Sequence, residues 1–155
     1  MDFIDSRTRA IGEMALNGLH ERAKAISANT VNVLTPNYQR KEVSFEKSLQ
    51  GVIERENAKE ELKIQNTIAY QKNPSEFLKG QTLEQTMFLN SPTQEGFFID
   101  VETDITEANG LDGNNVNLEV EMMDEAKNGM QYQVVASLLS KSYAMMNTII
   151  KGQNQ

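Results

Sequence analysis

The chain has 155 residues, of which 39% are hydrophobic and 6% aromatic, and it contains neither tryptophan nor cysteine. This length fits one domain, and the modest apolar share predicts a small independent core. The net charge of -7, without a dense cluster of lysine and arginine, argues against nucleic acid as a partner. The absence of cysteine excludes disulfides and thiolate metal sites.

The N-terminus lacks the pattern of a cleaved secretory signal. Residues 1–7 carry acidic side chains where a signal peptide has basic ones, and no apolar run follows them. No stretch of the sequence is long and apolar enough to predict a membrane span. If the chain leaves the cytoplasm, we expect a route that uses no cleaved signal.

The first predicted element is an amphipathic helix from about residue 6 to residue 33. Apolar residues at spacings of three and four form its stripe: Ile11, Ala15, Leu19, Ala23, Ile26, Thr30 and Val33. Gly12 and Gly18 interrupt this helix, and each costs about 1 kcal/mol relative to alanine. Either a neighbouring helix approaches closely at these glycines, or the segment must unfold easily.

A turn is predicted at residues 35–38, because Pro36 restricts Thr35 to extended geometry and Asn37 tolerates a left-handed conformation. Residues 40–49 predict an extended piece that leads into a short helix at 48–52.

The rest of the middle region is polar. Residues 52–66 predict a marginal or mobile helix, because they carry many charges and few apolar anchors. Residues 73–109 contain two prolines and two glycines, followed by apolar and acidic residues that alternate from Phe97 to Ile105. This alternation predicts a strand with one face in water.

The last predicted element is a helix from Leu118 to about Lys151, entered through a turn cluster at 110–115, with Asn115 or Asn117 as its N-cap. A helix of about 34 residues is about 50 Å long, which exceeds the diameter of a compact domain. Its apolar residues form two stripes, which predict neighbours on two sides. One stripe comprises Met123, Ala126, Met130, Val134, Leu138, Met145 and Ile149, and the other Val135, Leu139, Met146 and Ile150.

Together these elements predict a mainly α fold. We expect long N- and C-terminal helices that pack as a coiled-coil-like pair, antiparallel or parallel, with a small irregular or β middle segment. The domain boundaries would separate an N-terminal helix at 1–35, a polar middle region at 36–115 and a C-terminal assembly helix at 116–155. The terminal stripes have too few apparent partners to offset ordering entropy in a free monomer, so we expect these segments to order on assembly.

Catalytic chemistry is not indicated. His20 is the only histidine, and no phosphate-binding loop or calcium loop is present. Acidic residues near the start of the last helix, such as Glu119 and Glu121, are interpreted as complementing the helix dipole. We therefore expect no enzyme activity, no cofactor and no metal. The methionines of the last helix fit either an adaptable interface or ordinary core packing.

Two segments resemble one known family. The run from Ala25 to Tyr38, Ala-Ile-Ser-Ala-Asn-Thr-Val-Asn-Val-Leu-Thr-Pro-Asn-Tyr, resembles the N-terminal motif of bacterial flagellar axial proteins, a Ser-x-Asn-x-x-Asn core followed by Thr-Pro-Gly-Tyr. Thr30 and Val31 depart from the usual residues, and Asn37 replaces glycine, the substitution most easily made at such a turn. The run 112–122, with Tyr-Gln at 132–133 and Leu-Leu-Ser-Lys at 138–141, resembles the ending of one rod member of that family.

The resemblance implies a structural subunit of the rod of the flagellar basal body, located in the periplasm. Such a subunit is exported by the flagellar type III apparatus and polymerises through its terminal helices into a tube that transmits torque. The implied partners are copies of itself, other flagellar rod proteins, the adaptor between the MS ring and the rod, and the export apparatus. The alternative is a cytoplasmic helical adaptor or export chaperone.

Candidate assembly residues come from both ends of the chain. They lie on the apolar stripes or in the motif segments: Ile11, Leu19, Ile26, Asn29, Asn32, Thr35, Pro36, Tyr38, Asn115, Met123, Met130, Gln133, Leu138, Met145 and Ile149.

Overall fold

The computed structural model describes residues 6–104 and 112–152, apart from the side chains of residues 149 and 150. The elements in this part of the chain, in order, are α1 (Ser6–Val31), β1 (Lys41–Ser44), α2 (Glu46–Lys72), α3 (Pro74–Gly80), α4 (Leu83–Asn90), β2 (Asp100–Thr103) and α5 (Leu118–Gly152). The predicted fold, mainly helical with a small β segment in the middle, is confirmed.

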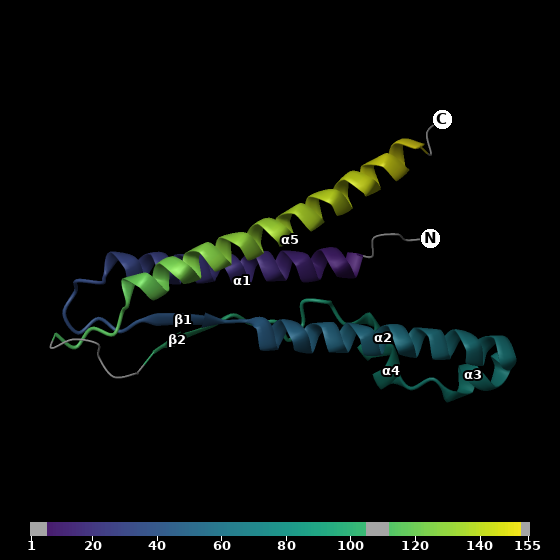
Figure 1. Cartoon of the computed structure of the whole chain (residues 1–155). Helices are drawn as coiled ribbons and strands as arrows, with labels where there is room; N and C mark the ends of the chain where they lie inside the picture. Colours follow the sequence, from purple (N-terminus) through teal and green to yellow (C-terminus); the bar gives the residue numbers. More distant parts are fainter. Residues whose placement is uncertain (1–5, 105–111, 153–155) are drawn as a thin grey trace.

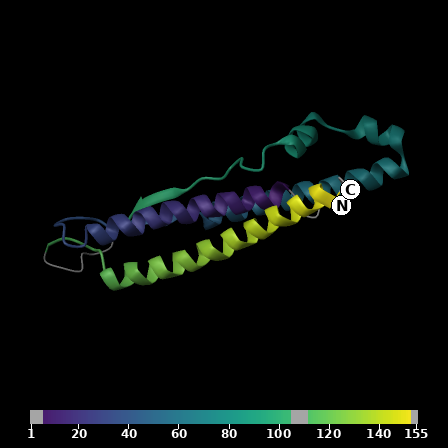
Figure 2. The same cartoon turned by 90° about the horizontal axis from the view of Figure 1, so that it is seen from above.

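The terminal helices α1 and α5 lie side by side and run in opposite directions (Figures 1 and 2). The contacts along the pair show this direction. Near the start of α1, Arg9 contacts Met146, whereas further along Leu19 accepts a hydrogen bond from Asn128. Towards the C-terminal end of α5 the Tyr143 hydroxyl donates to Glu13 Oε1 at 2.9 Å, so the contact with α1 continues there. Figure 1 also shows that α2 extends past the start of α1 as an arm on which α3 and α4 fold back.

The core lies where α1 meets β1 and the start of α2. Its buried centre consists of Leu19, Ala25, Val43 and Phe45, with Leu49, Phe97, Ile99 and Val135 packed against it. The middle region thus supplies α1 with a second neighbour besides α5. The expectation that the stripe of α1 has too few partners in a single chain does not hold for the described part of that helix.

Both glycines of α1 lie at close contacts. A Cβ atom on Gly18 would overlap the ring of Phe45, and one on Gly12 would lie 2.9 Å from Leu139 Cδ2. Of the two explanations for these glycines, close packing is the one the structure supports.

Replacing Gly18 with alanine is therefore expected to lower the free energy of unfolding by about 1–3 kcal/mol, because the Phe45 ring must move out of its buried site. Gly51→Ala is the matched control: it lies within α2 with nothing within 4 Å of the added atom, and should gain about 0.5–1 kcal/mol. Urea unfolding followed by circular dichroism measures both. Equal stability of the two variants would show that α1 and Phe45 do not approach as described.

The helices predicted at 48–52 and 52–66 are present, but as parts of one continuous helix, α2, which runs from Glu46 to Lys72. The side chains that anchor it include charged ones, which a count of apolar residues misses. Lys59 is buried and donates to Glu56 Oε1 at 2.7 Å and to the Ser91 carbonyl at 2.8 Å. This pair attaches the returning chain to α2.

The expected turn-rich stretch that follows contains two short helices. A capping box begins α4, in which Thr82 accepts from the backbone of Gln85 and the Gln85 side chain accepts from the backbone of Thr82.

The predicted strand is present but shorter, and β2 pairs antiparallel with β1 so that Val43 lies opposite Val101. All four residues of β2 are exposed, whereas Val43 of β1 is buried. The apolar residues of the alternation that pack against the core are Phe97 and Ile99, which precede β2. β2 itself is exposed because β1, not β2, lies against α1. Ile105, the last residue of the predicted alternation, is outside the described residues.

The last helix begins and ends close to the predicted residues. Its N-cap is Asn117, whose side chain accepts from the backbone of Glu119 at 2.9 Å and of Val120 at 3.4 Å. Of the two stripes, the one with Leu139 faces α1, and the one with Met130 is exposed.

Among residues 6–104 and 112–152, no helix is both long and apolar enough to cross a membrane.

Candidate functional site: a polar junction between the terminal helices

A cluster of polar side chains joins the end of α1 to the start of α5. We call it the junction; its members are Asn29, Tyr38, Arg40, Asn114, Asn115 and Glu121. The first three lie in or just after the motif-like segment near the N-terminus, and the last three lie in the segment that enters and begins α5. The junction therefore connects the two segments that resemble flagellar axial proteins.

Asn29 is fully buried and uses both ends of its amide. Its Nδ2 donates to the Lys41 carbonyl at 2.9 Å and to Glu121 Oε2 at 3.2 Å. Its Oδ1 accepts from the Lys41 backbone at 2.8 Å and from the Tyr38 hydroxyl at 3.2 Å. One side chain thus holds α1, the turn, β1 and α5 together, and it needs both a donor and an acceptor to do so.

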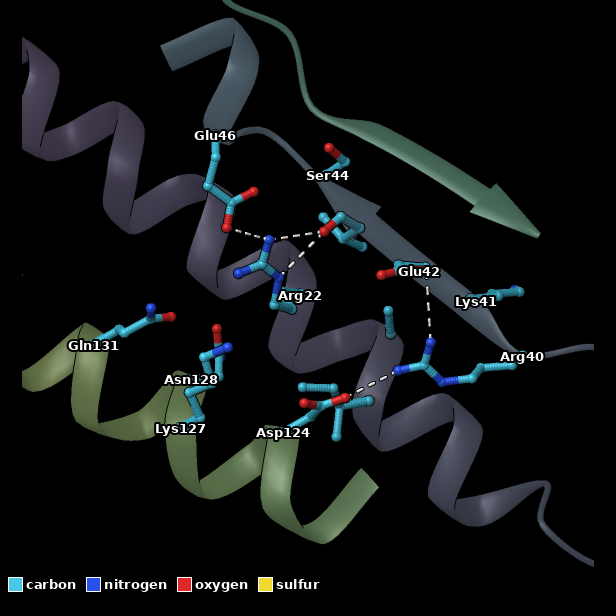
Figure 3. Close-up of a pocket in the computed structure, with 13 residues that line it drawn as sticks. Arg22, Arg40, Lys41, Glu42, Ser44, Glu46, Asp124, Lys127, Asn128 and Gln131 are labelled. Carbon is cyan, nitrogen blue, oxygen red and sulfur yellow. Dashed lines mark hydrogen bonds and ion pairs between the residues drawn. The ribbon is translucent and has the colours of Figure 1, made fainter. Parts of the chain in front are cut away.

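Glu121 is also fully buried, and Arg40 supplies the charge that it needs. Arg40 Nε donates to Glu121 Oε1 at 2.6 Å, and the guanidinium also donates to Asp124 Oδ2 at 3.0 Å. Figure 3 shows Arg40 extending from the start of β1 towards Asp124 on α5 and towards Glu42. The ion pair between Arg40 and Glu121 thereby fixes the start of β1 against α5.

The ionisation of the junction follows from this arrangement. Burial disfavours the charged form of Arg40, but the hydrogen bond and the charge of Glu121 outweigh it and raise the pKa of the guanidinium. Burial, and then the charge of Glu121, raise the pKa of the Tyr38 hydroxyl above its usual range. At neutral pH Arg40 is therefore charged and Tyr38 is a neutral donor.

Asn114 closes the C-terminal end of α1. Its Nδ2 lies 2.9, 3.1 and 2.9 Å from the carbonyl oxygens of Asn32, Val33 and Thr35 in the turn that follows α1, and shares its two N–H groups among them. The turn at residues 35–38 contains one residue in the left-handed conformation, Asn37, with a φ of 58°. The backbone N–H of Asn37 donates to the Asp112 carbonyl at 2.9 Å.

Asn115 fixes the next step of the chain. Its Oδ1 accepts from the Arg40 backbone at 2.6 Å, and its Nδ2 donates to the Asp104 carbonyl at 2.8 Å. The alternative in which Asn115 serves as the N-cap of α5 is wrong, because its side chain bonds to Arg40 and Asp104, the residues next to β1 and β2, instead.

Asn114→Ala is expected to lower the free energy of unfolding by about 1–3 kcal/mol, because it removes the buried amide that donates to the carbonyls of the turn after α1. Asn57→Ala, at an exposed position within α2, should be neutral or slightly stabilising, since alanine is the better helix former. Thermal unfolding of both variants measures the difference, and a shift of the same size in both would exclude the capping role of Asn114.

The structure divides the candidate assembly residues into three groups. Buried within the chain are Leu19, Ile26, Asn29 and Asn115, and half-buried are Ile11, Asn32 and Tyr38. Thr35 and Pro36 are exposed at the turn. Exposed on α5 are Met123, Met130, Gln133, Leu138 and Met145, and the side chain of Ile149 lies outside the described part.

Sequence reasoning missed Arg40, Asn114 and Glu121. The interpretation of Glu121 as a residue that only complements the helix dipole is incomplete, because its carboxylate is buried against Arg40. The signal available in the sequence was Arg40, a lone arginine two residues after the motif-like segment ends at Tyr38.

The junction is built for holding elements together. Its acidic and amide side chains form hydrogen bonds to the backbone and ion pairs with one another's elements. Among residues 6–104 and 112–152, no group of histidine and acidic residues could hold a metal ion. A cavity of about 300 Å³ adjoins the junction, between α1, β1 and α5 (Figure 3). There, Arg22 pairs with Glu46 at 2.6 Å.

Comparison with known proteins first gives a class. No family model matches the chain. The curated proteins to which it is similar are flagellar basal body rod proteins, and the similarity extends over almost the whole chain, including the middle region.

The particular relatives are FlgB proteins. The chain is 29% identical to FlgB of Escherichia coli (strain K12) over 153 residues, which cover 98% of this chain and 99% of the relative. The same values hold for FlgB of Shigella flexneri. FlgB of Salmonella typhimurium (strain LT2) is 27% identical over 154 residues, with 99% of each chain covered. These similarities support a FlgB-like flagellar rod protein.

Proposed function

We propose that this chain is a structural subunit of the flagellar basal-body rod that assembles through its terminal helices. The subunit is exported by the flagellar type III apparatus and adds to the rod in the periplasm, where the helical array transmits torque. Its partners are further copies of itself, other rod proteins, the adaptor between MS ring and rod, and the export apparatus. Its role is structural and not catalytic.

The observation that carries this proposal is the second stripe of α5. The helix packs on α1 with one side, while Met123, Met130 and Leu138 are each more than 60% exposed on the other. A row of large, exposed apolar side chains along a helix of 35 residues is typical of a surface that binds another protein. The junction supports the same reading, because it fixes α1 and α5 as one unit that can be repeated in an array.

The proposal is tested by following the tagged chain in the bacterium that encodes it. We expect the chain to co-purify with isolated basal bodies, and its deletion to abolish motility and the rod. The chaperone alternative makes the opposite prediction: a defined soluble complex in the cytoplasm, absent from basal bodies. Basal bodies that retain a complete rod without this chain would overturn the proposal.

A further inference from the structure

The outer edge of β2 is open to a further strand. Among residues 6–104 and 112–152 the sheet has two strands, and β2 pairs with β1. β2 lies at the margin of the molecule, on the side of β1 away from α1 and α5 (Figures 1 and 2). All four of its residues are exposed, so an extended segment can approach this edge.

The register identifies the backbone groups at the open edge. Next to the paired strands, the Asp104 N–H donates to the Arg40 carbonyl at 2.8 Å, which makes these two residues a hydrogen-bonded pair. Along an antiparallel ladder, such pairs alternate with pairs whose backbone groups point outwards. The N–H and C=O groups of Val101 and Thr103 consequently point away from β1, towards the open edge.

The opposite edge of the sheet shows how such groups are satisfied. There the N–H and C=O groups of Lys41 bond to the Asn29 side chain, and the Val43 carbonyl accepts from Arg22 at 2.9 Å. Side chains of α1 thus take the place of a third strand beside β1. No described residue does this for the outward groups of β2, which remain available to a partner.

One face of the open edge is acidic. Asp100 and Glu102 are exposed on it, and neither forms an ion pair with a described residue. Glu102 lies directly opposite Glu42 of β1, and like charges in this position repel each other. A cationic side chain on an added strand would relieve this repulsion.

Space for such side chains is present beside β2. Asp100 and Glu102 line a hollow of about 640 Å³ between β2 and the start of α2. The basic residues that also line it are Lys47 and Arg55, and Arg55 pairs with Glu95 at 3.8 Å, so acidic residues are in excess.

The other face of β2 is apolar at Val101, which is 55% exposed. Because successive residues of a strand point to opposite faces, a strand added to β2 places every second side chain beside the acids and the others beside Val101. A second copy of β2 does not fit this pattern. Asp100, Glu102 and Asp104 alternate along it, so pairing through the free groups would place acid beside acid.

We infer that the open edge of β2 binds an extended segment of a different protein, in which lysine or arginine alternates with apolar residues. The backbone of that segment pairs with Val101 and Thr103, and its cationic side chains lie beside Asp100 and Glu102. The net charge of -7 attracts such a partner from a distance. This surface is separate from the exposed stripe of α5 and adds a partner to the proposed function.

The probe is the peptide Lys-Val-Lys-Val-Lys-Val-Lys, added to the purified full chain. Amide hydrogen exchange followed by NMR should show slower exchange of the Val101 and Thr103 N–H groups when the peptide is present. The Glu102 N–H is the internal control, because it already bonds to β1 and should change little. The peptide Glu-Val-Glu-Val-Glu-Val-Glu should not bind.

Val101→Pro separates strand pairing from general attraction between charges. Proline is tolerated at an edge position whose N–H faces solvent, and the substitution leaves every charge in place. We expect it to weaken binding of the lysine peptide by about tenfold or more, because the edge loses a donor and gains a ring. A lysine peptide N-methylated at its valines should show the same loss with the unmodified chain, which covers the case in which the variant does not fold.

Unchanged affinity in both of these experiments would overturn the inference. Absence of protection at Val101 and Thr103, or equal binding of the glutamate peptide, would overturn it as well. None of these results bears on the proposed function, which the purification of basal bodies tests separately.

Discussion

Replacing Arg40 with alanine is expected to lower the free energy of unfolding by about 3–5 kcal/mol, the largest loss from any single substitution at the junction. The reason is the environment of Glu121, whose carboxylate is 0% exposed and is paired with Arg40 Nε at 2.6 Å. Without the guanidinium, a charge remains buried with only the amide of Asn29 as a donor. Urea unfolding of the purified chain measures the loss.

Two variants test whether the unpaired charge causes this loss. Arg40→Ala combined with Glu121→Gln should recover part of the stability, because glutamine is neutral. Lys24→Ala removes an exposed ion pair with Glu21, which solvent screens, and should leave the free energy of unfolding almost unchanged. If Arg40→Ala is no worse than Lys24→Ala, the junction does not hold the two helices together.

Leu138→Asp is expected to abolish rod assembly while leaving export and folding intact. The side chain is 63% exposed in the chain, so a carboxylate there is solvated before assembly. In the assembled rod the carboxylate would be buried without a partner. Because burying an unpaired charge costs much free energy, the variant subunit should not assemble. The same result is expected for Met145→Asp and, from the sequence pattern, for Ile149→Asp. Motility, counts of complete basal bodies and the amount of exported subunit are the measurements.

The controls separate assembly from folding. Ser140→Asp places a carboxylate two residues further along on the opposite side of α5, and motility should persist. Leu139→Asp changes a buried residue that packs against Gly12, so it should destabilise the subunit itself. Normal rods in the Leu138→Asp strain would refute the assignment of the exposed stripe as an interface.

The sequence predicted the terminal helices because their periodicity persists over many turns. Apolar spacings of three and four from Ile11 onward place α1, and the turn cluster before Asn117 places the start of α5. The glycines of α1 indicated a close approach, although the sequence did not identify Phe45 and Leu139 as the neighbours. Local patterns of this kind are sufficient when an element is long and amphipathic.

The middle region and the junction could not be predicted in this way because their stability depends on contacts distant in sequence. The buried pair of Lys59 and Glu56 stabilises α2 only once Ser91 returns to accept a hydrogen bond. Glu121 lies 81 residues from Arg40, and in sequence it is indistinguishable from the exposed Glu119 that complements the dipole. Only the fold reveals which acid is buried.

The junction gives a physical account of the motif-like residues. Asn29 and Tyr38 are needed because a buried amide and a hydroxyl complete one hydrogen-bond network with Glu121, and the turn between them places both. The residues that resemble the family at the two ends of the chain therefore fix how α1 and α5 lie relative to each other. The exposed stripe of α5 is then presented in a defined direction for neighbouring subunits.

The most direct test of this account is electron cryo-microscopy of basal bodies isolated from the bacterium that encodes the chain. The account predicts density in the rod for α1 and α5 as an antiparallel pair joined at Arg40 and Glu121, with the face that carries Met123, Met130 and Leu138 against a neighbouring subunit. Density in which that face lies in solvent, or rods that contain no such subunit, would contradict it.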